Sequence, residues 1–135
     1  MQGAPDAVAN HVGKDKWTLV MVWSTACVTC RMETPAVDAY YQANSKGRVR
    51  VLGVAINGHA RKKAIEGFRA DYGMSFPTLV ADPSQYLGHF KAQTGRPFSG
   101  TPTFLLYSPA GELSGINVGA INLEKLDAFI ASQPG

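Results

Sequence analysis

The sequence contains few cysteines: two in 135 residues, Cys27 and Cys30, and both stand in one C-x-x-C motif. A small scaffold held together by disulfides needs more pairs than this, so that class of protein is excluded. No second cysteine pair is present to complete a four-cysteine zinc site. Attachment of a c-type haem requires C-x-x-C-H, and because position 31 is Arg that class is excluded as well.

Long hydrophobic runs are also missing. The longest uninterrupted apolar stretch covers residues 19–23, far below the roughly 20 residues that a helix needs to cross a bilayer. The first five residues have neither a basic start nor an apolar run, so no signal peptide is visible. Two possibilities stay open at this point: the protein is cytosolic, or the chain begins after a leader that was removed.

Charge of one sign is in only small excess. Thirteen Lys and Arg against ten Asp and Glu give a net charge of +3. The basic clusters at Arg48/Arg50 and at residues 61–63 are too few and too scattered to indicate a nucleic-acid surface.

Hydrophobic residues make up 45% of the chain, enough for a packed core and too many for a disordered protein. We expect one globular domain spanning residues 1–135.

Short apolar segments predict the strands. Residues 18–23 and 49–56 are continuous runs rich in β-forming side chains, which is typical of strands covered on both faces. Residues 76–81 predict a shorter strand. Residues 103–108 and 113–118 predict a hairpin, because Pro and Gly between them suit a tight turn.

Helices are predicted between these strands. The longest is expected over residues 28–44, where an apolar stripe is formed by Val28, Met32, Ala36, Ala39 and Tyr40. Pro35 should kink its second or third turn. The remaining helices are expected over residues 5–12, over 60–72 after an opening Asn57-Gly58, from Asp82 to Thr94, and after Asn122. The inward-facing side chains are expected to be Ala64, Ile65, Phe68 and Tyr72 in the second of these, and Leu123, Leu126, Phe129 and Ile130 in the last.

From residue 18 onward the order β-α-β-α-β-α-β-β-α predicts the fold class. Strand–helix–strand units require right-handed crossovers, which place helices on both faces of a sheet. The final hairpin adds antiparallel strands, so the sheet is mixed. The sequence therefore predicts an α/β fold with three layers, α/β/α, around a mixed central sheet.

The C-x-x-C motif falls where a buried strand passes into a helix. A helix N-terminus offers unpaired N–H groups and a partial positive charge, both of which favour thiolate over thiol. Such positions lower a cysteine pKa from about 8.5 to roughly 3.5–7.5. Cys30 lies one turn deeper on the same face, within reach of a disulfide. Cys27 is therefore expected to be the exposed attacking thiol and Cys30 the shielded resolving thiol in thiol–disulfide exchange.

The cysteines have two other interpretations, a metal site and plain core packing. A zinc or copper site would need further ligands, and nothing pairs His11, His59 or His89 with the motif. Two cysteines that only pack in the core would be expected inside a strand. This pair opens a helix, which makes plain packing a weaker interpretation.

Residues 23–35, Trp-Ser-Thr-Ala-Cys-Val-Thr-Cys-Arg-Met-Glu-Thr-Pro, resemble the active-site segment of thioredoxin-fold proteins. The similarity is closest to the membrane-anchored or periplasmic branch of TlpA-, ResA- and CcmG-like reductases, whose pattern is W-x-x-x-C-x-x-C-[RK]-x-E-x-P. A second match, Gly-Thr-Pro-Thr-Phe-Leu over residues 100–105, is similar to the loop that holds the family's cis-proline. The resemblance covers residues 18–130 and implies a thioredoxin-like fold.

This resemblance implies roles for individual residues. Trp23 would pack beside the disulfide, or simply fill the core. Glu33 would tune or relay the proton of Cys30, or else be an exposed helix carboxylate. Pro102 would follow a cis bond, with the Thr101 backbone pairing with an incoming polypeptide beside the reactive sulfur. The sequence departs from thioredoxin itself at Met21, where thioredoxin has a buried Asp, and between the cysteines, where Val-Thr replaces Gly-Pro.

The resemblance also implies partners. It favours reduction of protein disulfides in the periplasm, with apocytochrome c or copper-site proteins as candidate substrates and an upstream partner that re-reduces the cysteines. No cofactor, metal ion or nucleic acid is expected. Two alternatives remain: an oxidase that uses the same chemistry, and a non-catalytic module that handles copper or another metal through Cys27 and Cys30.

Overall fold

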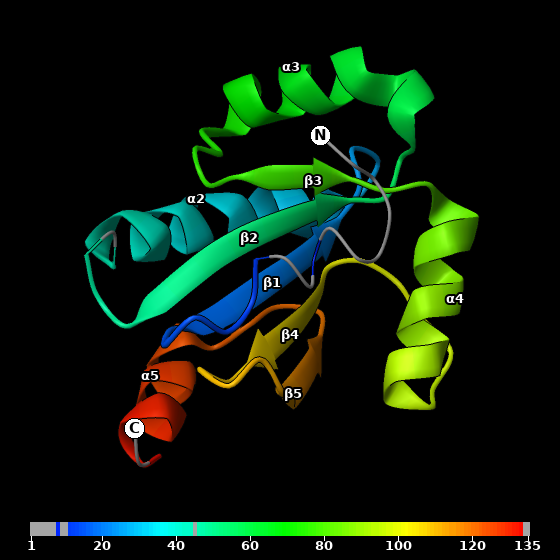
Figure 1. Ribbon diagram of the computed structural model, residues 1–135. Helices are drawn as coiled ribbons and strands as arrows, with labels where there is room; N and C mark the ends of the chain where they lie inside the picture. The colour runs from blue at the N-terminus through cyan, green and yellow to red at the C-terminus, as the bar shows by residue number, and fades with distance from the viewer. Residues whose placement is uncertain (1–7, 9–10, 45, 134–135) are drawn as a thin grey trace.

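The computed structural model describes residues 8, 11–44 and 46–133, and it confirms the predicted order of elements (Figure 1). The helix expected over residues 5–12 falls mainly outside the described residues. The strands are β1 (Trp17–Trp23), β2 (Val49–Ala55), β3 (Thr78–Val80), β4 (Thr103–Tyr107) and β5 (Leu113–Val118). The helices are α2 (Val28–Ala43), α3 (Lys62–Tyr72), α4 (Pro83–Thr94) and α5 (Leu123–Ala131), and a 3₁₀ turn, η1 (His59–Arg61), precedes α3.

The five strands form one mixed sheet in the order β3-β2-β1-β4-β5. β1 pairs in parallel with β2 and antiparallel with β4, so it lies at the centre of the sheet. All seven of its residues are buried, which explains why this strand is a continuous apolar run in the sequence. The edge strand β5 has no buried residue.

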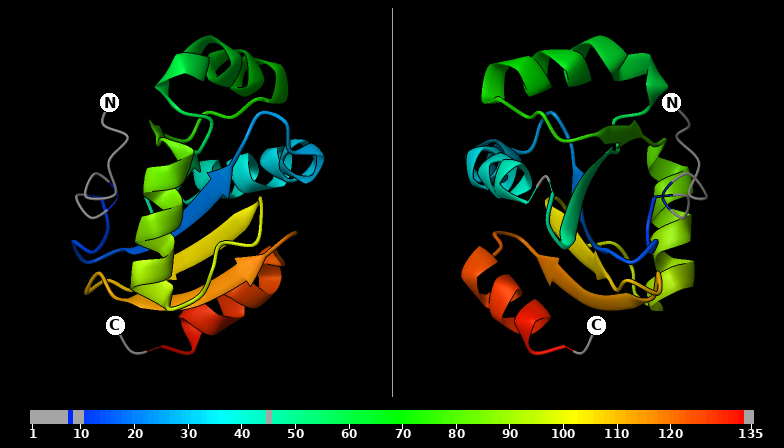
Figure 2. Two further views of the ribbon diagram at one scale, coloured as in Figure 1. Left: turned by 90° about the vertical axis from the view of Figure 1, so that its right-hand side faces the viewer. Right: turned by 60° about the vertical axis from the view of Figure 1, so that its left-hand side comes forward.

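Helices cover both faces of the sheet, as predicted. Figure 2 shows α4 on one side of the sheet and α2 and α5 on the other, with α3 near the β3 edge. Side chains alternate along a strand, and β1 divides accordingly. Leu19, Met21 and Trp23 join the hydrophobic cluster that contains residues of α2, α3 and α5, whereas Val20 and Val22 join the cluster that contains residues of α4.

The predicted apolar stripe of α2 is wrong at four of its five positions, and only Tyr40 is buried as expected. Val28 is 63% exposed and Met32 is 74% exposed, and Ala36 and Ala39 are exposed too. The buried face is instead the one that carries Cys30, Thr34, Val37, Asp38 and Tyr40.

The buried face of α2 contains polar residues because their hydrogen bonds are satisfied within the protein. The Thr34 hydroxyl donates to the Cys30 carbonyl at 2.7 Å. The Asp38 carboxylate accepts from the backbone N–H of Ser75 at 2.7 Å and from that of Phe76 at 3.2 Å. A pattern of apolar residues alone therefore selects the opposite face of this helix.

Smaller departures concern the other elements. In α3, Ile65 and Phe68 are buried but Ala64 is exposed. In α5, Ile130 is buried, whereas Phe129 is 40% exposed and packs edge-on against Trp17. The strand predicted over residues 76–81 is shorter than expected, because only three of these residues pair with β2.

Candidate active site

Cys27 and Cys30 lie where β1 passes into α2. β1 ends at Trp23, a three-residue loop follows, and Cys27 is the N-cap residue of α2 with φ −85° and ψ 110°. The loop is closed by a hydrogen bond from the Cys27 N–H to the Ser24 carbonyl at 3.2 Å. The two cysteines form a disulfide, with their Cα atoms 5.2 Å apart. The predicted strand–cysteine–helix arrangement is therefore present.

The two sulfur-bearing residues differ in exposure. Cys27 is partly exposed, whereas Cys30 is 0% exposed and belongs to the hydrophobic cluster under α2. Cys27 Sγ accepts a hydrogen bond from the Cys30 N–H at 3.0 Å. This N–H is one of the donors of the helix N-terminus that have no partner within the helix, so the helix directs this donor at the sulfur that solvent can reach.

Trp23 is the last residue of β1 and immediately precedes the loop that leads to Cys27. It is fully buried in the same cluster as Cys30, and its indole N–H donates to Thr78 Oγ1 at 3.4 Å. Its ring packs on Phe68 with the centroids 4.6 Å apart. No side chain can be accommodated at Gly53, since a Cβ there would overlap Thr78 Oγ1 and lie 3.1 Å from Trp23 Nε1. Both expected roles of Trp23, core filler and neighbour of the cysteine pair, are compatible with this position.

Thr101 and Pro102 lie beside the same end of the sheet. The Thr101–Pro102 peptide bond is cis, and β4 begins immediately after it. Because Thr103 pairs with Val22, the residues just before Thr103 flank the end of β1 from which the cysteine loop departs. Pro102 is buried, and its carbonyl accepts from the Gly119 N–H at 2.8 Å.

Glu33 is half-buried, and the simple picture of an exposed carboxylate does not describe it. Its Oε1 accepts from the backbone N–H of Ile121 at 2.8 Å. This bond joins α2, one turn beyond Cys30, to the segment between β5 and α5. Among the described residues its hydrogen-bond partner is thus a backbone group and not a cysteine.

Two polar contacts around the site were not foreseen from the sequence. The side chain of Asn57 bonds to Thr25 in the cysteine loop, and Asp38 bonds to the segment that leads into β3. Both join residues more than 30 positions apart in the chain, so no local pattern could reveal them. The one sequence signal was the spacing of Cys30, Thr34 and Asp38 at every fourth residue of a helix.

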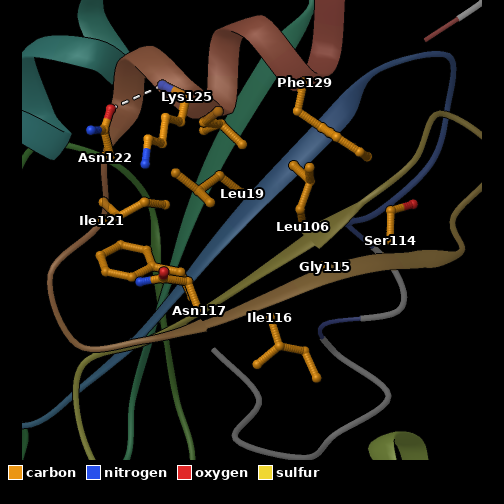
Figure 3. Close-up of a pocket in the computed structure, with 12 residues that line it drawn as sticks. Leu19, Leu106, Ser114, Gly115, Ile116, Asn117, Ile121, Asn122, Lys125 and Phe129 are labelled. Atoms are coloured by element: carbon orange, nitrogen blue, oxygen red, sulfur yellow. Dashed lines mark hydrogen bonds between the residues drawn. The ribbon is translucent and has the colours of Figure 1, made fainter. Parts of the chain in front are cut away.

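A cavity of about 250 Å³ lies away from the cysteines, between α5 and strands β4 and β5 (Figure 3). Its wall is mainly apolar and includes Leu19, Leu106 and Phe129, while Lys125 and Asn122 stand on the α5 side. Neither cysteine lines it.

Within residues 8, 11–44 and 46–133, no group of three or more His, Cys, Asp or Glu could hold a metal ion. None of the helices described is long and apolar enough to cross a membrane.

Comparison with known proteins gives a family match over most of the chain. The model of the AhpC/TSA family matches residues 5–116. The thiol-disulfide oxidoreductase ResA of Geobacillus kaustophilus is 25% identical over 132 residues, which cover 98% of this chain and 70% of the relative. The sporulation thiol-disulfide oxidoreductase A of Bacillus subtilis is 22% identical over 114 residues, covering 84% of this chain and 66% of the relative. The chain spans 56% to 70% of the length of the curated relatives that it matches.

Solved structures agree on the fold. The crystal structure of StoA from Bacillus subtilis matches with a TM-score of 0.70 and 20% identity, covering 87% of this chain and 84% of that one. A thiol:disulfide interchange protein of the thioredoxin family from Chlorobium tepidum matches with a TM-score of 0.74 and 21% identity, covering 93% and 82%. The fold is therefore thioredoxin-like, as the sequence indicated.

Proposed function

Because the chain belongs to the AhpC/TSA family, we propose that it is a thiol–disulfide oxidoreductase that reduces protein disulfides through Cys27 and Cys30. The observation that carries this proposal is the disulfide between these residues at the N-terminus of α2, with one cysteine partly exposed and the other buried. Support comes from the relatives, which are named as enzymes of this class.

The reaction follows from this geometry in two steps. The Cys27 thiolate attacks one sulfur of a substrate disulfide; a bond forms between Cys27 and the substrate, and the other substrate sulfur leaves as a thiolate that takes up a proton. Cys30 then loses its proton and attacks Cys27 Sγ, which releases the second substrate sulfur as a thiolate. Two electrons have passed to the substrate, and the Cys27–Cys30 disulfide remains until an upstream partner reduces it.

The helix N-terminus supports the first step. In the disulfide form the Cys30 N–H already points at Cys27 Sγ, and in the dithiol form the same donor would face the thiolate. A hydrogen bond to a charged acceptor is stronger than one to a neutral acceptor, and the helix dipole adds to it. Cys27 is thus the thiol that ionises first, and Cys30, buried beneath it, is the thiol that completes the exchange.

The other site residues take supporting roles in the proposal. The Thr101 backbone would pair with an extended substrate segment beside Cys27; the register of β4 against β1, which brings residue 103 opposite residue 22, supports this. Trp23 would support the cysteine pair, since both lie in one buried cluster. Glu33, one turn beyond Cys30 and partly shielded from water, would influence the ionisation of Cys30 through its negative charge.

Partners and location are the finer part of the proposal. We place the protein outside the cytoplasm, in the periplasm or its equivalent, with apocytochrome c or copper-site proteins as substrates. The family resemblance of residues 23–35 supports this placement. One of the structural neighbours is described as a secreted disulfide oxidoreductase.

The order in which the two thiols react tests the proposed roles. When the reduced protein meets a dilute alkylating agent at neutral pH, Cys27 is expected to be modified well before Cys30, because it is both more exposed and closer to the helix N-terminal donors. Mass mapping of peptides after short reaction times measures this order. Modification of Cys30 first, or of both thiols at equal rates, would show that the roles are assigned wrongly.

A further inference from the structure

The side chain of Asn57 does not bond to the 3₁₀ turn that follows it in the sequence. It does not cap the 3₁₀ turn η1, whose N-cap residue is Gly58 and whose first N–H, that of His59, donates to Asp82 Oδ1 at 3.4 Å. The Asn57 carboxamide bonds instead to Thr25, 32 residues earlier in the chain. Its Oδ1 accepts from the Thr25 backbone N–H at 3.0 Å, and its Nδ2 donates to Thr25 Oγ1 at 3.1 Å.

Thr25 lies in the middle of the loop that carries Cys27. The ladder between β1 and β2 continues up to this loop, because the Ile56 N–H donates to the Trp23 carbonyl at 3.0 Å. After this bond, the two hydrogen bonds of the Asn57 side chain join the segment that follows β2 to the loop that follows β1. Both bonds are partly shielded from solvent, where a lost partner costs more than at an exposed site.

Cys27 lies immediately after this anchored segment. Its Sγ accepts the Cys30 N–H at 3.0 Å only while Cys27 keeps its N-cap conformation. Hydrogen bonds weaken steeply as their distance and angle depart from the optimum. Without the bonds at Thr25, the loop can adopt more conformations. Cys27 Sγ is then hydrogen-bonded to the Cys30 N–H in a smaller fraction of them.

We propose that Asn57 is a positioning residue for thiol–disulfide exchange: by holding Thr25 it keeps Cys27 Sγ at the N-terminus of α2. This inference rests on the proposed function, since it takes Cys27 as the attacking thiol. It predicts that loss of the carboxamide leaves the thiolate of the reduced form less stabilised. Cys27 then reacts more slowly at neutral pH, and the exchange equilibrium moves towards the disulfide, because a less stabilised dithiol is more easily oxidised.

The test compares Asn57→Ala with the wild-type chain and with Asn44→Ala as a matched control. Asn44 is also an asparagine with a side chain bonded to the backbone, to the Tyr40 carbonyl at 2.9 Å, but it lies at the opposite end of α2. Three quantities are measured: the alkylation rate of Cys27 at pH 7, the equilibrium constant with dithiothreitol, and the urea midpoint of unfolding. Asn57→Ala is expected to slow alkylation and to shift the equilibrium towards the disulfide, each about threefold to tenfold, as the loss of roughly one hydrogen bond implies. Asn44→Ala is expected to change neither.

A second variant keeps the test decisive if Asn57→Ala fails to fold. Thr25→Val removes the contact with Asn57 Nδ2 and leaves the backbone bond, so it is expected to shift both quantities in the same direction by a smaller factor, about twofold. In the Asn57→Ala background, Thr25→Val should add nothing further. The proposal is overturned if a folded variant of either kind matches the wild type in both the alkylation rate and the equilibrium. If Cys27 of the wild-type chain is not alkylated before Cys30, the proposed function itself fails. This outcome differs from failure of the Asn57 proposal, which requires a variant that matches the wild type.

Discussion

A Cys30→Ser variant is expected to accumulate as a covalent complex with its protein substrates. Cys27 can still attack a substrate disulfide, but the group that would resolve the resulting mixed disulfide is missing, and a serine hydroxyl does not replace a thiolate as nucleophile. Cys30 is adjacent to Cys27 Sγ, and the sequence contains no third cysteine that could act in its place. Non-reducing gel electrophoresis followed by peptide mapping measures the complex, and the link should involve Cys27 alone.

The matched variant, Cys27→Ser, is expected to lose exchange altogether. It removes the partly exposed sulfur and leaves only a buried one, which a polypeptide disulfide cannot reach. A loss of at least about 10³-fold in the rate of protein disulfide reduction is expected when a covalent nucleophile is removed. The account is contradicted if Cys27→Ser keeps appreciable activity, or if Cys30→Ser turns over substrate as fast as the wild type.

Replacement of Asp38 with Ala is expected to destabilise the fold by about 3 kcal/mol. Asp38 is 5% exposed, and its carboxylate accepts from the backbone N–H groups of Ser75 and Phe76, from the Ser75 hydroxyl at 2.9 Å, and from the Gln42 amide at 2.8 Å. Loss of this acceptor leaves the buried Phe76 N–H without a partner, and hydrogen bonds to a charged group contribute about 1.5–3 kcal/mol each. Urea unfolding at pH 7 measures the change in the free energy of unfolding.

The same interactions predict how this effect depends on pH. Burial raises the pKa of Asp38, but the hydrogen bonds from Ser75, Gln42 and Phe76 outweigh it, so the pKa lies below its ordinary value of 3.8. A carboxyl whose pKa is lowered in the folded state contributes stability above its unfolded pKa, and the contribution is lost as the pH falls through the folded pKa. The difference between wild type and Asp38→Ala should therefore be constant from pH 7 to about pH 5 and shrink below about pH 4.

Asp71→Ala is the control for this prediction, because Asp71 is an exposed carboxylate on α3. It should change the free energy of unfolding by no more than about 0.5 kcal/mol. If Asp38→Ala costs no more than Asp71→Ala, the carboxylate does not anchor the segment before β3.

The strands could be predicted from the sequence because the centre of this sheet is covered on both faces. Every residue of β1 is buried, so composition alone identifies the strand, and the start of a helix directly after it places Cys27. The order of the elements also predicts a mixed sheet with an antiparallel hairpin, whereas the strand order β3-β2-β1-β4-β5 comes from the structure.

The faces of the helices could not be predicted in the same way. In α2 the buried stripe includes Thr34, whose hydroxyl donates to the Cys30 carbonyl within the helix, and Asp38, whose carboxylate accepts from the backbone of the segment before β3. Hydrophobic periodicity assigns polar residues such as these to the surface. It predicts Val28 and Met32 in the core, although both are exposed. Only the tertiary structure reveals the partners that make a buried Asp acceptable.

Glu33 and Asn57 illustrate the same limit at the site. Their partners, Ile121 and Thr25, are 88 and 32 positions away. The family resemblance led to Glu33, but not to the backbone group that it holds. For Asn57 the sequence predicts only the start of a helix, and the structure shows in addition that its side chain bonds to Thr25 in another loop.

The midpoint potential of the Cys27–Cys30 pair, measured by equilibration with dithiothreitol and glutathione, tests the central claim most directly. A pair that reduces protein disulfides must give up its electrons readily, so the account predicts reversible cycling at a potential on the reducing side, towards the value of about −270 mV that thioredoxin has. A potential near −120 mV, which belongs to a strong oxidant, or a pair that does not cycle at all, would contradict it.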